Sequence, residues 1–172
     1  AYNAWDDEYQ TCFGRIPEFE NLASTTTKDC RLYLGASEQH HREITFINIE
    51  KIRMLRKEIS TFLSKKRTLL IIDEGHKIKN PNAASTEAAL EISKQAASRI
   101  ILTGTPMPNG YEDLYSLTEA LSPYKQILPY RYNQLKSMTN NGATDIEMTR
   151  IHESLDPYYS RTVSYTHLTL PT

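Results

Sequence analysis

The sequence predicts an α/β fold in which a parallel β-sheet is flanked by helices. Short apolar runs alternate along the chain with segments of helical periodicity. One run, Leu69–Ile72, is continuously apolar, as is typical of a strand covered on both faces. The order strand, helix, strand, helix favours parallel strands joined by crossover helices. A chain of 172 residues with 39% hydrophobic residues suits one compact domain.

Four segments have the composition and length of strands. They span residues 31–34, 44–49, 68–73 and 99–103. A helix is predicted between the second and third of them, because apolar residues follow three- and four-residue spacing. Those residues are Ile49, Ile52, Leu55, Ile59, Phe62 and Leu63.

Two further helices are expected in the second half of the chain. Asn80 and Pro81 suit the N-cap and first position of a helix over the Ala-rich stretch Ala83–Ala97. A helix over Gly110–Leu121 would end before Pro123. Residues 125–150 are polar and less periodic, so their organisation is not predicted.

Composition argues against several classes of protein. The net charge of −1 gives no bulk attraction for nucleic acid or an anionic membrane. No apolar run approaches the roughly 18 residues of a membrane span, and no signal peptide opens the chain. Cys12 and Cys30 lack the close spacing of a metal site, so a reducing cytoplasmic location is predicted.

The net charge conceals an uneven distribution. Residues 1–50 carry 4 Lys and Arg against 9 Asp and Glu, whereas residues 51–79 carry 9 against 3. This basic segment is either the solvated face of a helix or a contact for phosphate groups.

The strongest chemical signal is Asp73-Glu74-Gly75-His76, directly after the apolar strand. Ligands bind at the carboxyl edge of parallel sheets, where this strand would place both acids. Adjacent carboxylates there are costly unless a cation or a catalytic task compensates them. In nucleotide-hydrolysing sites such acids hold Mg²⁺ and orient the attacking water. An ordinary strand end with solvated acids is the alternative.

A second signal, Thr103-Gly104-Thr105-Pro106, follows the next predicted strand. If the strands are parallel, it lies at the same sheet edge. Gly104 permits a close approach of the backbone to a ligand, and the hydroxyls of Thr103 and Thr105 can bond the acids or a water. Taken alone, the segment is a tight turn.

Together these segments resemble the Swi/Snf-type DNA-translocating ATPases of helicase superfamily two. Ile71 to Asn80 (IIDEGHKIKN) is similar to the Walker B segment of that family and its extension. Ile101 to Asn109 (ILTGTPMPN), with Glu112 to Leu117 (EDLYSL), is similar to its third motif and the following helix. Residues 155–161 (LDPYYSR) more weakly resemble the linker toward the second lobe.

The resemblance implies a RecA-like P-loop NTPase lobe that binds ATP and Mg²⁺ against a second lobe and moves on duplex DNA, mainly through its phosphates. Asp73 would be the acid that holds Mg²⁺ through water, and Glu74 the general base. His76 would act as a catalytic relay toward the third motif. Thr103, Gly104 and Thr105 would couple the nucleotide site to the DNA contact.

One element of that family is missing from the sequence. None of the 6 glycines is followed by Lys, so there is no Gly-Lys-Ser/Thr phosphate loop. We therefore expect an internal fragment that does not hydrolyse ATP alone. Residues 1–124 would be part of the ATP-binding lobe, 125–162 a helical extension, and 163–172 a translated sequencing adapter.

Two other interpretations stay open at this point. The chain could belong to another superfamily-two helicase or to a restriction-enzyme motor subunit. It could also be a non-enzymatic nucleic-acid-binding module that keeps the sheet without the phosphate loop.

Overall fold

The computed structural model describes residues 2–160, so the segment 163–172 interpreted as an adapter lies outside the described residues. Four short strands within residues 2–160 form two parallel pairs. β1 (Phe19–Asn21) pairs with β2 (Ile44–Phe46), and β3 (Leu69–Ile72) pairs with β4 (Ser98–Ile101). In the second pair, Leu69 lies opposite Ser98 and Ile72 opposite Ile101. The α/β prediction with parallel strands is therefore confirmed.

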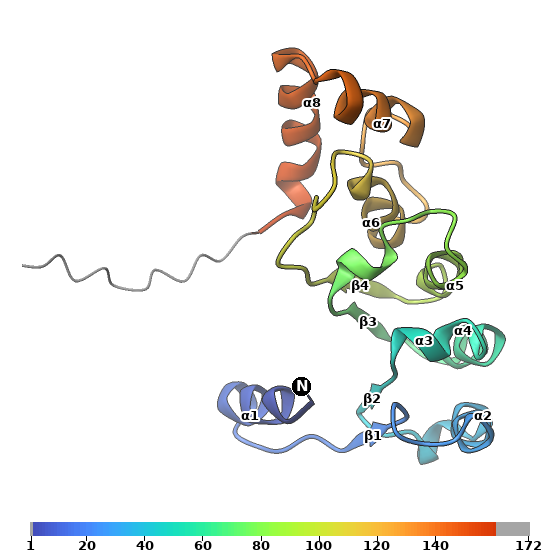
Figure 1. Ribbon diagram of the computed structural model, residues 1–172. Coiled ribbons are helices and arrows are strands. Elements are labelled where there is room, and N and C mark those ends of the chain that lie inside the picture. Colours follow the sequence, from blue (N-terminus) through green and yellow to red (C-terminus); the bar gives the residue numbers. More distant parts are fainter. Residues whose placement is uncertain (1, 161–172) are drawn as a thin grey trace, which may run out of the picture.

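Helices cover one side of these strands more fully than the other. Figure 1 shows α2 (Thr27–Gly35), α4 (Arg56–Lys65) and α5 (Ala84–Ser93) along one side, and α1 (Tyr2–Phe13) on the other. The helix between β3 and β4 is α5, so the predicted β-α-β unit is present.

The predicted strand at Arg31–Leu34 is wrong, because these residues lie in α2. Thr26 begins the helix: its hydroxyl accepts a hydrogen bond from the backbone N–H of Asp29 at 3.2 Å. Cys30 and Leu34 are four residues apart and therefore share a face, which is buried.

The predicted helix over residues 49–63 is divided into α3 (Ile49–Ile52) and α4. Leu55, between them, has φ −110° and ψ 15° and is fully buried. Its side chain joins the core formed by α2, α4 and the end of α5, so burial of Leu55 outweighs continuation of the helix.

Asn80 does not cap α5, in contrast to the prediction. Its side-chain oxygen accepts a hydrogen bond from the N–H of Asn82 at 3.0 Å, and its carbonyl accepts one from Ala83 at 3.1 Å. The two bonds form a turn, and Ala83 is the N-cap of α5.

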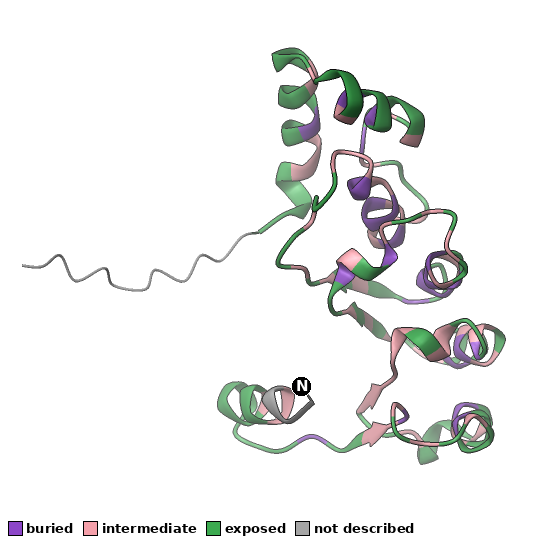
Figure 2. Cartoon of the chain, viewed as in Figure 1, coloured by how far each residue is buried: buried purple, intermediate pink, exposed green. Residues whose placement is uncertain are grey.

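Two helices lie in and just beyond the polar segment 125–150, whose periodicity alone favours no particular element. α7 (Tyr132–Asn141) and α8 (Asp145–Leu155) pack against α6 (Asp113–Leu121), with a 3-10 turn, η3 (Asp156–Tyr158), after α8. Thr144 and Glu147 form a capping box at the start of α8, and these bonds lower the pKa of the Glu147 carboxyl. Figure 2 shows buried residues concentrated in α6 and on the inner sides of α2, α4 and α5.

A lysine fixes the loop that follows β1. The Nζ atom of Lys51, in α3, donates hydrogen bonds to the carbonyls of Leu22, Ala23 and Thr25 at 2.6, 2.9 and 2.5 Å. Leu22 is 1% exposed, and Ala23 and Thr25 are half-buried. The Lys51 ammonium group therefore replaces water as the hydrogen-bond donor to this loop.

α1 is attached through an exposed ionic cluster. Arg15, just beyond the helix, donates two hydrogen bonds to the Glu43 carboxylate, at 2.7 and 2.8 Å. The Tyr9 hydroxyl also donates to Glu43. Hydrogen bonds from Arg15 and Tyr9 lower the pKa of Glu43 to about 2. Among residues 2–160, no helix is long and apolar enough to cross a membrane.

Candidate functional site at the carboxyl edge of β3 and β4

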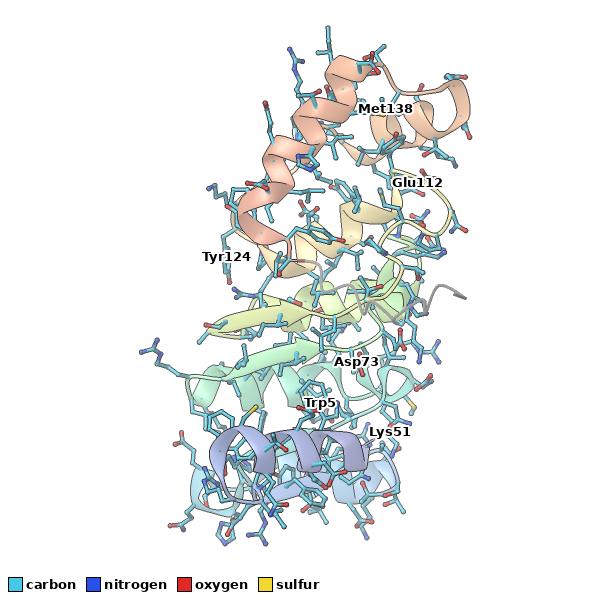
Figure 3. The ribbon with its side chains drawn as sticks, turned by 90° about the vertical axis from the view of Figure 1, so that its left-hand side faces the viewer. Trp5, Lys51, Asp73, Glu112, Tyr124 and Met138 are labelled. Carbon is cyan, nitrogen blue, oxygen red and sulfur yellow. The ribbon has the colours of Figure 1, made fainter. Side chains whose placement is uncertain are left out.

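The predicted acids lie directly beyond the last residue of β3, where Figure 3 shows Asp73 at the arrowhead end of the strands. Both acids are exposed. The backbone of Glu74 is left-handed, with φ 53° and ψ 49°, and among the described non-glycine residues it alone has a positive φ. Its N–H donates to Asp73 Oδ1 at 2.9 Å. The strand thus ends in a sharp turn that presents two carboxylates to solvent.

Two backbone hydrogen bonds hold this turn against the next strand. Leu102 N–H donates to the Ile72 carbonyl, and Gly75 N–H donates to the Leu102 carbonyl, both at 2.8 Å. The ladder between β3 and β4 therefore continues past the ends of both strands. It places the acid-bearing turn and the Thr-Gly-Thr segment at the same edge, as the sequence predicted.

His76 approaches Glu74, and the distance from its Nδ1 to Glu74 Oε2 is 3.2 Å. That nitrogen is buried but makes no hydrogen bond, so the contact is an ion pair only when the imidazole carries a proton. The structure gives His76 no hydrogen bond to Thr103 or Thr105, both of which it describes. The predicted relay to the third motif is therefore not connected by direct bonds in this conformation.

The Thr-Gly-Thr segment is nearly free of internal bonds. Thr103 Oγ1 accepts a hydrogen bond from the Thr105 N–H at 3.3 Å. Neither hydroxyl is bonded to Asp73 or Glu74 within the described residues. A Cβ added at Gly104 would meet no atom within 4 Å, so the backbone at this point is open to a ligand.

Gly75 is a site residue whose importance the sequence alone did not reveal. A Cβ at this buried position would lie 2.5 Å from Ile101 Cγ2 and 3.4 Å from Leu117 Cδ2. The Ile101 methyl is attached directly to its Cβ, so it cannot move away without a change of rotamer. The acid-bearing turn can therefore approach β4 and α6 this closely only because residue 75 has no side chain.

We expect Gly75→Ala to lower the free energy of unfolding of this chain by about 1–3 kcal/mol, the usual cost of overpacking a closed site. Urea denaturation followed by circular dichroism measures the change. Gly104→Ala is the matched control, because the added methyl there meets open space. Equal stability of the two variants would contradict this account of the turn.

A buried carboxylate in α6 connects the two loops. Asp113 is 4% exposed, and its Oδ2 accepts a hydrogen bond from the Asn109 N–H at 2.8 Å. The Nζ of Lys79 lies 3.8 Å from the same oxygen. Ser116, also in α6, donates from its hydroxyl to the Lys79 carbonyl at 3.1 Å. The sequence placed Lys79 and Asp113 within motifs but gave no sign that they meet.

The residues at the edge suit a cation that is shared with a ligand. Within residues 2–160 no group of three or more His, Cys, Asp or Glu side chains could hold a metal by itself. Mg²⁺ commonly takes only one or two protein carboxylates, together with waters and substrate phosphates. Asp73, exposed at the end of β3, fits that mode of binding.

Comparison with protein families identifies the chain. The model of the SNF2-related domain matches residues 2–169. The chain belongs to this family. A SNF2-related domain is consistent with both motifs at the sheet edge, and family membership implies the use of a nucleotide.

Relatives and a solved structure agree with this assignment. The SNF2-related domain is 34% identical over 123 residues to the human DNA excision repair protein ERCC-6. The aligned region covers 70% of this chain and 8% of that protein. It is 48% identical over 65 residues to the mouse helicase-like transcription factor, covering 38% of this chain and 6% of that protein.

The fold is similar to that of the Sulfolobus solfataricus SWI2/SNF2 ATPase core in complex with dsDNA. The TM-score is 0.64 at 21% identity, covering 91% of this chain and 30% of that one. The SNF2-related domain thus spans less than a tenth of the two relatives and about a third of the solved core.

Proposed function

We propose that the intact protein containing this SNF2-related domain is an ATP-dependent motor that moves on duplex DNA. The observation that carries the proposal is the pair of loops at one sheet edge, one bearing Asp73 and Glu74 and the other Thr103 to Thr105. Family membership and the likeness to an ATPase core described in complex with dsDNA support it.

In this proposal ATP is the substrate and Mg²⁺ the cofactor. Asp73 would hold the cation through a water, and the cation would neutralise charge on the phosphates. Glu74 would accept the proton of the attacking water. The His76 imidazole, whose Nδ1 lies 3.2 Å from Glu74 Oε2, would orient that carboxylate. Thr103 to Thr105 would couple the nucleotide site to the contact with DNA.

The domain organisation is part of the same proposal. Residues 1–124 would form part of the ATP-binding lobe, and residues 125–162 a helical extension toward a second lobe, for which α7 and α8 give support. The thiols of Cys12 and Cys30, both free, support a reducing compartment, which we propose is the cytoplasm.

DNA stimulation of ATP hydrolysis tests the motor function. The full-length gene that encodes this segment is cloned and the intact protein is expressed. Phosphate release from ATP is then measured with and without duplex DNA. We expect hydrolysis that rises on addition of DNA. ATP hydrolysis indifferent to DNA would contradict the translocase assignment, and strand displacement on a forked duplex would favour a strand-separating helicase.

A further inference from the structure

The loop that carries Thr103, Gly104 and Thr105 is fixed only at its two ends. Leu102, at one end, is held by the hydrogen-bond ladder to β3. Asn109, at the other end, is held by Asp113, through its N–H at 2.8 Å and its side-chain amide at 3.5 Å. Between these points the loop has the single internal bond from Thr105 to Thr103.

The acid-bearing turn also has two fixed points. Gly75 is bonded to Leu102, and Ile78, at the end of η2 (Gly75–Ile78), is fully buried in a cluster with Leu117 of α6. Lys79 follows directly. Its carbonyl accepts the Ser116 hydroxyl, and its ammonium group faces Asp113.

Both loops therefore end on the first turn of α6, and Asp113 is the group that they share. A buried carboxylate is costly unless it is paired, and here its Oδ2 is divided between the two loops. Movement of Lys79 away from Asp113 would leave this carboxylate with the hydrogen bonds from Asn109 and the N-terminus of α6 but without a facing positive charge. The position of one loop thus affects the energy of the other.

We propose that Asp113 is a positioning residue that couples the nucleotide side of the site to the DNA side. A shift of the segment that carries Asp73 and Glu74 would move Lys79 relative to Asp113. The strength of the hydrogen bond from Asn109 to Asp113, which holds the loop of Thr103 to Thr105, would change as a result. The inference rests on the proposed motor function, because it requires both ligands. Asp113 itself touches neither reacting group.

The coupling is measured in the intact protein as the ratio of two dissociation constants for duplex DNA, with and without a non-hydrolysable ATP analogue. In Asp113→Asn the amide oxygen still accepts from the Asn109 N–H, but the longer bond from the Asn109 side chain and the charge facing Lys79 are lost. The ratio is written with the larger dissociation constant as the numerator. For Asp113→Asn we expect this ratio to fall toward 1 by about fivefold or more, which is the fold-change that typical coupling energies produce. The affinity for DNA without nucleotide should stay unchanged.

Three further variants separate coupling from folding. Asp113→Glu keeps the charge and should restore part of the ratio. Lys79→Met should reproduce the loss, and combining it with Asp113→Asn should add little, because both remove the same interaction. Lys77→Met is the matched control, since Lys77 is exposed and lies two residues before Lys79.

The outcomes distinguish this inference from the proposed function. If the unsubstituted protein shows no effect of the ATP analogue on DNA binding and no DNA stimulation of hydrolysis, the motor assignment fails. If it shows both and the two substitutions leave the ratio unchanged, the coupling role of Asp113 is wrong. A lowered affinity for DNA without nucleotide, with the ratio preserved, would also contradict it. Should Asp113→Asn not fold, Lys79→Met decides the question alone.

Discussion

In the proposed motor, Glu74→Gln is expected to reduce DNA-stimulated ATP hydrolysis by roughly 10²–10⁴-fold, the usual contribution of a general base. The amide keeps the size and the left-handed backbone position of the side chain but cannot take up the proton of water. Binding of ATP should remain, because the substitution removes no group that the proposal assigns to holding phosphate or Mg²⁺. Steady-state phosphate release measures the first effect, and nucleotide affinity the second.

Lys77→Gln is the matched control for this experiment, since it changes an exposed charge in the same segment. Retention of more than about a tenth of the activity by Glu74→Gln would show that another group activates the water. A parallel loss of nucleotide binding would place Glu74 in binding rather than in proton transfer.

Lys51→Met is expected to lower the free energy of unfolding of this chain by about 1–3 kcal/mol. The ammonium group serves three carbonyls at once, and methionine fills a similar volume with no donor. The carbonyl of the buried Leu22 and those of the half-buried Ala23 and Thr25 would then lose their shared donor, and each group left unsatisfied carries its desolvation cost. Urea denaturation monitored by circular dichroism gives the value.

Lys57→Met provides the comparison, because Lys57 is an exposed residue of α4. Its effect should stay below about 0.5 kcal/mol, as for surface substitutions generally. If Lys51→Met and Lys57→Met lower the free energy of unfolding equally, the three hydrogen bonds of Lys51 contribute no more to stability than an exposed lysine of a helix does.

The sequence predicted the strands β2, β3 and β4, with the continuously apolar Leu69–Ile72 of β3 as the clearest signal, but it did not predict β1. Arg31–Leu34 resembles a strand in the sequence because it too is a short run of mostly hydrophobic residues. The helix there depends on two features that lie outside the short run or in its tertiary contacts: the cap at Thr26 and the burial of Cys30 together with Leu34. Tertiary packing therefore decided the secondary structure of this segment.

The same distinction applies to the site. The acids and the Thr-Gly-Thr segment could be placed at one edge because parallel strands that follow one another through a helix end on the same side. The link from Lys79 to Asp113 could not be predicted, because it depends on how α6 packs against η2. Likewise, the need for glycine at position 75 follows only from the position of the Ile101 methyl.

The left-handed backbone at Glu74 has a consequence for evolution under selection. A side chain at this position stores roughly 1–2 kcal/mol of strain that glycine would avoid and asparagine would reduce. A library of variants sorted for folding alone should therefore become depleted of glutamate at residue 74. Retention of glutamate under such sorting would mean that relief of the backbone strain at residue 74 does not increase the stability of the fold. Selection for thermostability and selection for hydrolysis would thus act in opposite directions on one residue.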